Sequence, residues 1–214
     1  LSRGLGDVYK RQTIAYQFDD VCYALEGSIF MAGANFQWLR DKMNFFEDVE
    51  ESEELAKKAD PNANVYLIPA FVGLGAPHWV PDARGAIFGL TRDAGKEELS
   101  LATHEAIAFQ TKEIISSLEN DGIKVDSVRI DGGLTSNAFF NQILSNVIER
   151  EVLCSKTVES TALGAAYLAG IGSGEVSLKD ISKNWSPKSE YNPDSSYDLG
   201  RYDIWKEFLG RLIG

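Results

Sequence analysis

An apolar run that passes through two glycines into a polar stretch, at residues 125–140, limits the folds open to this chain more than any other segment. Val128 and Ile130 precede Gly132 and Gly133, and residues 135–137 are Thr-Ser-Asn, a favourable helix start. The order predicts strand, glycine turn and helix. Glycines let the backbone approach a ligand, and a helix start presents N–H groups and the positive end of its dipole, so a phosphate or nucleotide site fits. An ordinary tight turn explains the same residues.

The composition is that of a globular protein with a strong negative charge. With 214 residues, 44% of them hydrophobic, the chain can bury the core of one large domain. A formal net charge of -11 without a Lys/Arg cluster argues against a nucleic-acid partner. No apolar run or signal-peptide pattern predicts a membrane association. Cys22 and Cys154 lie far apart and indicate neither a disulfide framework nor a zinc site, which fits a reducing cytoplasm.

The first part of the chain contains a change of pattern. Residues 1–12 show no periodicity that joins them to the rest, so they are interpreted as a non-native leader, and the domain is expected to span residues 13–214. Runs rich in β-forming residues at 13–18 and 21–25 predict a hairpin. After it, apolar side chains at alternating spacings of three and four predict a helix whose buried stripe is Ile29, Ala32, Phe36, Leu39 and Met43.

Two residues on this expected helix form a second candidate contact surface. Gly33 and Gln37 lie four positions apart, and therefore one turn apart on the same face. A flat ligand could lie on the glycine and be contacted by the amide. Close helix packing at Gly33 beside a solvated Gln37 is the alternative interpretation. The acidic segment at residues 47–60 predicts a solvated surface helix.

A second glycine-containing loop follows a buried strand. The continuous apolar run at residues 65–71 predicts a strand covered on both faces, and it leads into Gly-Leu-Gly-Ala-Pro-His-Trp at 73–79. Pro77 and the lack of a helix directly after the loop exclude a dinucleotide-binding turn. His78 and Trp79 could contact a substrate from this loop, but they are interpreted as its packed anchors.

The remaining chain predicts three helices and two short strands. On a long helix over residues 97–120, His104 and Glu105 diverge by about 100° and are interpreted as packing and solvent residues. A helix rich in small residues begins at 159–161, which suits close packing near a ligand crevice or against another helix. Strands alternate with helices after residue 65, so the predicted fold class is α/β. The strands are expected at 86–90 and 152–154, and the terminal amphipathic helix carries Leu199, Tyr202, Trp205, Leu209 and Leu212.

Six motifs follow one another along residues 13–205, namely Ala24-Leu25-Glu26-Gly27, Met31-Ala32-Gly33-Ala34 with residues 37–41, 69–71 with 73–79, 83–92, Asp131-Gly132-Gly133 and 161–170. Together they resemble the C-terminal half of glycerol kinases, members of the FGGY family of carbohydrate kinases. The resemblance implies an actin-like ATPase (ribonuclease H-like) domain, the C-terminal nucleotide-binding half of a two-domain sugar kinase whose N-terminal domain is missing from this chain. The loop at 73–79 favours glycerol kinases over their sugar-kinase relatives. His104 departs from the apolar residue usual in the family, which affects local packing.

Carried over by motif, the resemblance implies nucleotide contacts at Gly33, Gln37, Gly132, Gly133 and Asn137. The implied cofactors are ATP and Mg2+, and the implied partners are ATP or ADP, glycerol and the missing N-terminal domain. No catalytic residue or metal ligand is assigned to this chain, because the family's catalytic aspartate lies upstream. The full-length parent is therefore expected to phosphorylate glycerol to sn-glycerol 3-phosphate in the cytoplasm, and the isolated chain to be inactive.

Two other interpretations stay open. Another FGGY carbohydrate kinase, such as a pentulose kinase, would carry related motifs. A non-catalytic actin-like module would keep the nucleotide contacts without transferring phosphate. A homo-oligomer is also compatible with the sequence.

Overall fold

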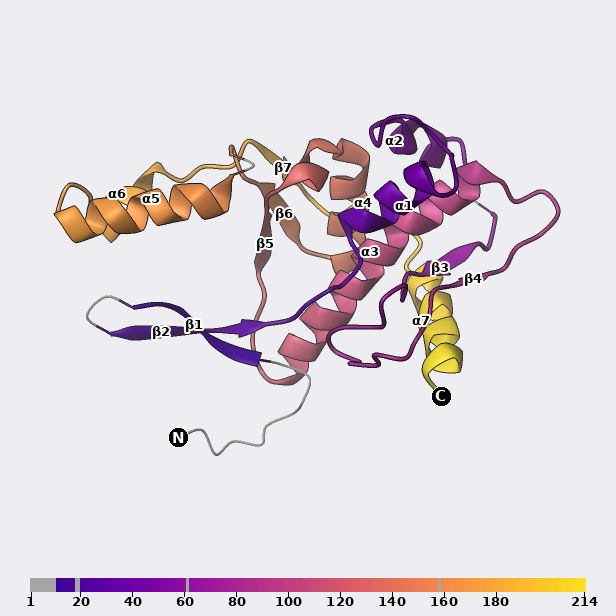
Figure 1. The fold of residues 1–214 in the computed structure, drawn as a ribbon, viewed down its shortest axis with the longest axis horizontal. Coiled ribbons are helices and arrows are strands. Elements are labelled where there is room, and N and C mark those ends of the chain that lie inside the picture. The colour runs from indigo at the N-terminus through magenta and orange to yellow at the C-terminus, as the bar shows by residue number, and fades with distance from the viewer. Residues whose placement is uncertain (1–10, 18–19, 61, 158) are drawn as a thin grey trace. The chain divides into compact units, whose positions relative to one another are not determined.

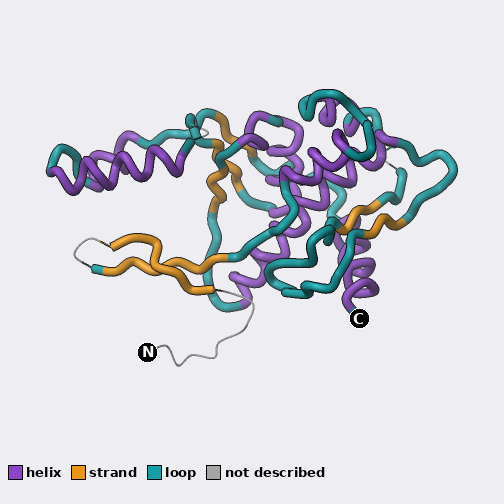
Figure 2. Tube along the Cα trace, viewed as in Figure 1, coloured by secondary structure: helices purple, strands orange, loops and turns teal. Residues whose placement is uncertain are grey.

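The structure is a computed structural model that describes residues 11–17, 20–60, 62–157 and 159–214. The chain divides into two compact units, shown as a ribbon in Figure 1 and by secondary structure in Figure 2. Unit 1 contains the chain up to Lys124 together with residues 198–214, and unit 2 contains residues 125–197. The chain therefore leaves unit 1 once and returns to it with its last helix.

The predicted hairpin opens the described part of unit 1. Strands β1 (Arg11–Gln17) and β2 (Val21–Glu26) pair antiparallel, with Ile14 opposite Tyr23, and form the long two-stranded ribbon in Figure 1. The register shifts between Ile14 and Tyr16, as at a β-bulge. The strand already includes Arg11 and its neighbour Gln12, whereas residues 1–10 of the expected leader lie outside the described residues.

The helix after the hairpin is shorter than the sequence pattern predicts. Helix α1 spans Gly33–Asp41, so the prediction that Ile29 and Ala32 belong to it is wrong. The cause is a long-range contact, because the carbonyl oxygen of Ser28 accepts a hydrogen bond from the amide of Ala76 at 2.9 Å and holds this segment against the loop at 73–79. Of the predicted stripe, Phe36 and Leu39 are buried, and Met43, beyond the helix, is 41% exposed.

The core of unit 1 surrounds the long helix α3 (Lys96–Asn120), near the centre of Figure 1. Strand β3 (Tyr66–Ile68) pairs antiparallel with β4 (Ala86–Phe88) and packs against α3, as does the short helix α2 (Glu51–Ala56). Residues 102–110 of α3 are consequently buried without interruption. The helix expected over the whole acidic segment is limited to α2, and three of its residues, Ser52, Leu55 and Ala56, are buried.

The terminal helix α7 (Gly200–Ile213) docks on this core, as its apolar spacing predicts. Trp205 is 1% exposed and donates a hydrogen bond from Nε1 to the carbonyl oxygen of Leu67 at 2.9 Å. Its ring centroid lies 5.6 Å from that of Phe109 on α3. A residue near the end of the chain therefore completes the core built by β3 and α3.

Unit 2 is a three-stranded sheet with one connecting helix against it. Strand β6 (Glu151–Cys154) lies between β5 (Ser127–Ile130), to which it is parallel, and β7 (Ser189–Tyr191), to which it is antiparallel. Helix α4 (Ala138–Ile148) connects β5 to β6 and confirms the predicted strand, turn and helix. Its buried apolar residues are Phe140, Ile143, Leu144, Val147 and Ile148.

Two further helices of unit 2 are largely exposed. Helix α5 (Ser160–Ser173) has no buried residue within the described chain, so the close packing predicted for its small residues is not observed there. It ends at Gly174, which has a φ of 79° and the left-handed conformation common after helices, whereas Gly170 and Gly172 lie inside it. Helix α6 follows over Leu178–Asn184.

Candidate functional site

The glycine turn after β5 leaves open space beside its backbone. Gly132 has a φ of 89° and a ψ of -179°, a conformation that is essentially restricted to glycine. A Cβ atom added at Gly132 or at Gly133 would have no described atom within 4 Å. Because neither glycine is packed against described side chains, this part of the turn can accept a ligand close to the backbone.

Side-chain hydroxyls fix the turn from within. The four residues Gly133–Ser136 form a single 3-10 turn, labelled η1, between β5 and α4. Thr135 donates from Oγ1 to the carbonyl oxygen of Gly132 at 2.7 Å, and Ser136 donates from Oγ to that of Gly133 at 2.8 Å. The Thr-Ser pair expected to begin the helix therefore shapes the turn before it.

Asn137 is the residue that caps α4. Its Oδ1 accepts a hydrogen bond from the backbone N–H of Phe140 at 2.8 Å, the usual N-cap contact to the third helical residue. The resemblance implies a nucleotide contact at Asn137. In the structure, its side chain caps the start of α4. Asp131, between the strand and the glycines, is exposed.

The second candidate surface lies on α1. Gly33 is the first residue of the helix, and an added Cβ there would have no described atom within 4 Å. This open space contradicts the alternative in which Gly33 serves close helix packing. Gln37 follows one turn later and is exposed. The structure thus keeps the predicted pair on one helix, with an unfilled glycine and an accessible amide.

The loop at 73–79 packs against the segment that precedes α1. A Cβ at Gly75 would lie 2.1 Å from the oxygen of Ser28, so only glycine allows this backbone contact. Trp79 packs edge-to-face on Phe30, with ring centroids 6.0 Å apart. His78 lies with Nε2 3.2 Å from Oε2 of Glu113 on α3. The interpretation of His78 and Trp79 as packed anchors is confirmed.

Glu113 is the centre of a partly buried polar cluster that joins this loop to α3 and α7. Its Oε1 accepts a hydrogen bond from the hydroxyl of Tyr202, and Nζ of Lys206 lies 4.0 Å away. Burial acts to raise the pKa of Glu113, but His78, Tyr202 and Lys206 outweigh this and leave that pKa below its usual value. For Tyr202, burial and the neighbouring carboxylate raise the pKa. The cluster is a structural connection, and none of the predicted site residues belongs to it.

One expectation about α3 is confirmed and one is wrong. His104 is fully buried and packs against Phe36 of α1 with ring centroids 4.7 Å apart, and burial lowers its pKa to about 4. Glu105, expected in solvent, is 2% exposed and accepts two hydrogen bonds of 2.7 Å from Arg201 of α7. A single glutamate on a helix gives no sign of its burial, because the arginine lies 96 residues away.

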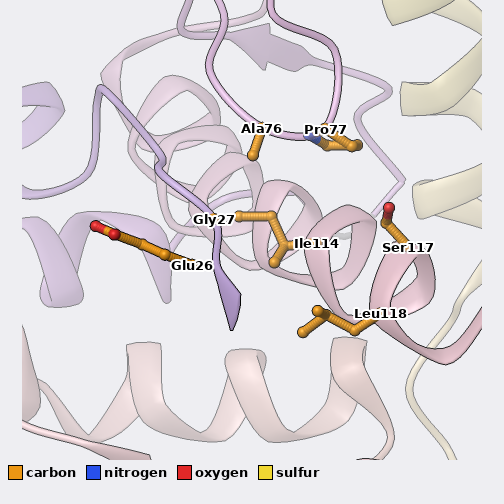
Figure 3. Close-up of a pocket in the computed structure, with 7 residues that line it drawn as sticks. All are labelled: Glu26, Gly27, Ala76, Pro77, Ile114, Ser117 and Leu118. Atoms are coloured by element: carbon orange, nitrogen blue, oxygen red, sulfur yellow. The ribbon is translucent and has the colours of Figure 1, made fainter. Parts of the chain in front are cut away.

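The cavities of unit 1 do not coincide with the predicted contacts. One of about 10 Å³, shown in Figure 3, lies between β2, the loop at Ala76 and α3. It is too small and too apolar to hold more than one water molecule. A wider surface cavity of about 270 Å³ is lined by residues 60 and 62–64 and by residues of the 89–98 segment. Neither includes Gly33 or Gln37.

The described residues contain no group of three or more His, Cys, Asp or Glu residues that could hold a metal ion. Among the helices of the described chain, none is long and apolar enough to cross a membrane.

Proteins of known sequence or structure resemble this chain over nearly its whole length. A glycerol kinase of Alteromonas mediterranea is 43% identical over 204 residues, which are 94% of this chain and 41% of that protein. The crystal structure of Plasmodium falciparum glycerol kinase with ADP matches with a TM-score of 0.83 at 34% identity, over 95% of this chain and 42% of that one. A ligand-bound xylulose kinase from Lactobacillus acidophilus matches with a TM-score of 0.82 at 25% identity, over 95% and 42%.

The chain spans about two fifths of the length of these relatives. Its fold is that of the C-terminal part of sugar kinases with the actin-like ATPase fold, as the resemblance of its motifs implies. The model of the C-terminal domain of one kinase family matches residues 10–173, which is most of the chain. The chain therefore belongs to the FGGY family of carbohydrate kinases, as a C-terminal domain of that family.

Proposed function

We propose that the full-length parent of this chain transfers a phosphoryl group from ATP to glycerol, giving sn-glycerol 3-phosphate, and that this chain supplies part of the ATP site. The supporting observation is the similarity to glycerol kinases, at 43% identity over 94% of the chain for the relative from Alteromonas mediterranea. The P. falciparum kinase of similar fold is described with ADP, which supports an adenine nucleotide as the ligand.

Within unit 2, the proposed ATP contacts are Gly132, Gly133 and Asn137. The open space beside both glycines would admit phosphate oxygens or the adenosine close to the backbone. The start of α4 adds the positive end of a helix dipole, which favours a negatively charged ligand. Asn137 would contact the nucleotide from its capping position.

Within unit 1, the proposed contacts are Gly33 and Gln37. The unfilled surface at Gly33 offers a flat area for part of the nucleotide, and the exposed Gln37 can donate or accept a hydrogen bond at its edge. Both groups fit a neutral, planar part of the ligand better than its phosphates, because neither carries a positive charge.

Bound ATP would supply the phosphoryl group and bring Mg2+ with its phosphates. Mg2+ bound in this way is held by the phosphates, by waters and by one or two carboxylates, and we assign none of these carboxylates to this chain. The rest of the parent, including its N-terminal domain, would bind glycerol and provide the general base. A cytoplasmic location is part of the proposal, and it fits the two free cysteines, Cys22 and Cys154.

The experiment is a steady-state assay of the full-length parent, encoded by the upstream reading frame, with glycerol and with xylulose as acceptors. Glycerol-dependent formation of ADP at a much higher kcat/KM than with xylulose supports the proposal. A preference for xylulose favours the pentulose kinase instead, and a reading frame that starts near Thr13 favours a non-catalytic module. The isolated 214-residue chain is expected to show no turnover above background.

A variant of the parent tests the contribution of α1. Gln37→Ala should raise KM for ATP several-fold and change KM for glycerol little, since the exposed side chain contributes only to nucleotide binding. Arg40→Ala on the same helix is the matched control, because its side chain is 38% exposed and pairs with the neighbouring Asp41. Equal effects of the two substitutions would contradict the assignment of Gln37.

A further inference from the structure

A buried asparagine lies near the start of each of the two helices that follow or contain the predicted glycine contacts, α1 and α4. Asn35 lies in the first turn of α1, two residues after Gly33, and Asn141 lies in α4, four residues after Asn137. Both side chains are 0% exposed. Sequence reasoning singled out neither, because asparagine within a helix usually indicates a solvated position.

Each asparagine holds two carbonyl groups of the segment that leads into its helix. Asn35 donates from Nδ2 to the oxygen of Met31 at 2.9 Å and from its backbone N–H to that of Ala32 at 3.0 Å. The Met31 carbonyl can only accept, so Nδ2 of Asn35 must face it. The bonds fix the two peptide groups immediately before Gly33, at a helix start where the N-cap residue Ala32 provides no side-chain cap.

Unit 2 repeats the arrangement with different neighbours. Asn141 donates from Nδ2 to the oxygen of Thr135 at 2.9 Å and from its backbone N–H to that of Asn137 at 3.1 Å. Thr135 belongs to the turn that its own hydroxyl ties to Gly132. Asn141 thereby connects the interior of α4 to the turn that carries the two glycines.

Each of these two side chains also has a feature that lowers the stability of the fold. Within the described chain, Oδ1 of Asn35 and Oδ1 of Asn141 are buried without a hydrogen-bond partner. Such an acceptor gives up its hydrogen bonds to water on burial and gains none in return, and leucine has a similar branched shape without this penalty. A buried group that lowers stability in this way calls for a functional explanation.

We propose that Asn35 and Asn141 are positioning residues of the nucleotide site, each of which orients a glycine-bearing backbone segment from the protein interior. The proposal rests on the proposed function, since it assumes that these segments contact the nucleotide. Neither side chain touches the ligand. Each acts through the carbonyl groups that it holds, and these set the direction of the peptides at Gly33 and in the turn of Gly132 and Gly133.

The test compares Asn35→Leu and Asn141→Leu in the full-length parent, with ADP and Mg2+ as the probe. Removal of the fixed hydrogen bond should raise the Kd for ADP about tenfold, while the midpoint of thermal unfolding stays equal or rises. Ser52→Ala is the matched control, because Ser52 is also 0% exposed with an unpartnered Oγ in the described chain but lies in α2. Its Kd should not change.

Hydrogen exchange without nucleotide gives an independent readout. Backbone amides at residues 31–34 in Asn35→Leu, and at 132–137 in Asn141→Leu, should exchange faster than in the wild type. Unchanged exchange in both segments overturns the inference, as does a loss of affinity that is matched by a lower unfolding midpoint. A wild-type parent that binds no ADP overturns the proposed nucleotide site itself, whereas tight binding that both leucine variants retain overturns only the positioning role.

Discussion

The two helix starts that we assign to the nucleotide are stabilised in different ways. Helix α1 begins at an alanine without a capping side chain, and it is held by the core through Phe36, which is buried against His104 of α3. The start of α4 is held locally by the hydroxyls of Thr135 and Ser136 and by the cap at Asn137. The stability of the contact surface on α1 should therefore depend on the stability of the core. The stability of the surface at the start of α4 should depend on its own short-range hydrogen bonds.

The largest effect is expected from the buried ion pair between α3 and α7. Arg201→Met removes two hydrogen bonds to the carboxylate of Glu105, which is 2% exposed, and should lower the free energy of unfolding by about 3–5 kcal/mol. Chemical denaturation measures this loss. Arg211→Met on the same helix is the control, since Arg211 is 67% exposed and its ion pair with Glu207 lies at the surface, so little change is expected.

Hydrogen exchange in the Arg201→Met variant then tests the difference between the two helix starts. Amides of α1 should lose protection together with the core, while those of the 133–137 turn should change less. Equal loss in both segments would contradict the comparison.

The next effect concerns the glycine turn of unit 2. Gly132→Ala places a Cβ on a backbone with a φ of 89°, and should lower the free energy of unfolding by about 1–3 kcal/mol. Gly133→Ala is the matched variant, because Gly133 does not have a positive φ and an added Cβ finds open space there. Comparable losses in the two variants would show that strain at Gly132 is not what shapes the turn.

A group in unit 1, the side chain of His104, should make the stability of the protein depend on pH. Burial lowers the pKa of His104 from 6.5 to about 4, so the unfolded chain binds the proton more readily than the folded one. Stability from this group is complete above pH 6.5 and is lost as the pH falls toward 4, with a decrease of about 2 kcal/mol between pH 7 and pH 5. His104→Gln should flatten this part of the profile. An identical profile in the variant would show that other groups cause the dependence.

The smallest effect is the loss of one cap. Asn137→Ala should lower the free energy of unfolding by about 1 kcal/mol, because the N–H of Phe140 loses its acceptor. Asn137→Ser should retain most of that stability while lacking the amide. Weaker ADP binding in both variants, with a stability loss only in the alanine variant, would separate the proposed nucleotide contact from the capping role.

Short-range features of both units were predictable. The hairpin, the glycine turn, the start of α4 and the docking of α7 follow from residue types and spacings within a few positions. The N-terminal end of α1 was not predictable. The apolar pattern continues back to Ile29, but Ser28 accepts a hydrogen bond from Ala76, which is distant in the sequence. The buried Asn35 and Asn141 were also missed, since their burial depends on packing that a helical pattern does not reveal.

Local sequence specifies where the chain turns, where α4 is capped and which segments are helical, because these properties depend on backbone conformation and on neighbouring side chains. The open space beside Gly33, Gly132 and Gly133, the buried contact of Glu105 with Arg201 and the exposure of α5 within the described chain are instead properties of the folded molecule. Burial and charge pairing depend on contacts between residues far apart in the sequence, and the pattern of one segment carries no information about its distant partner.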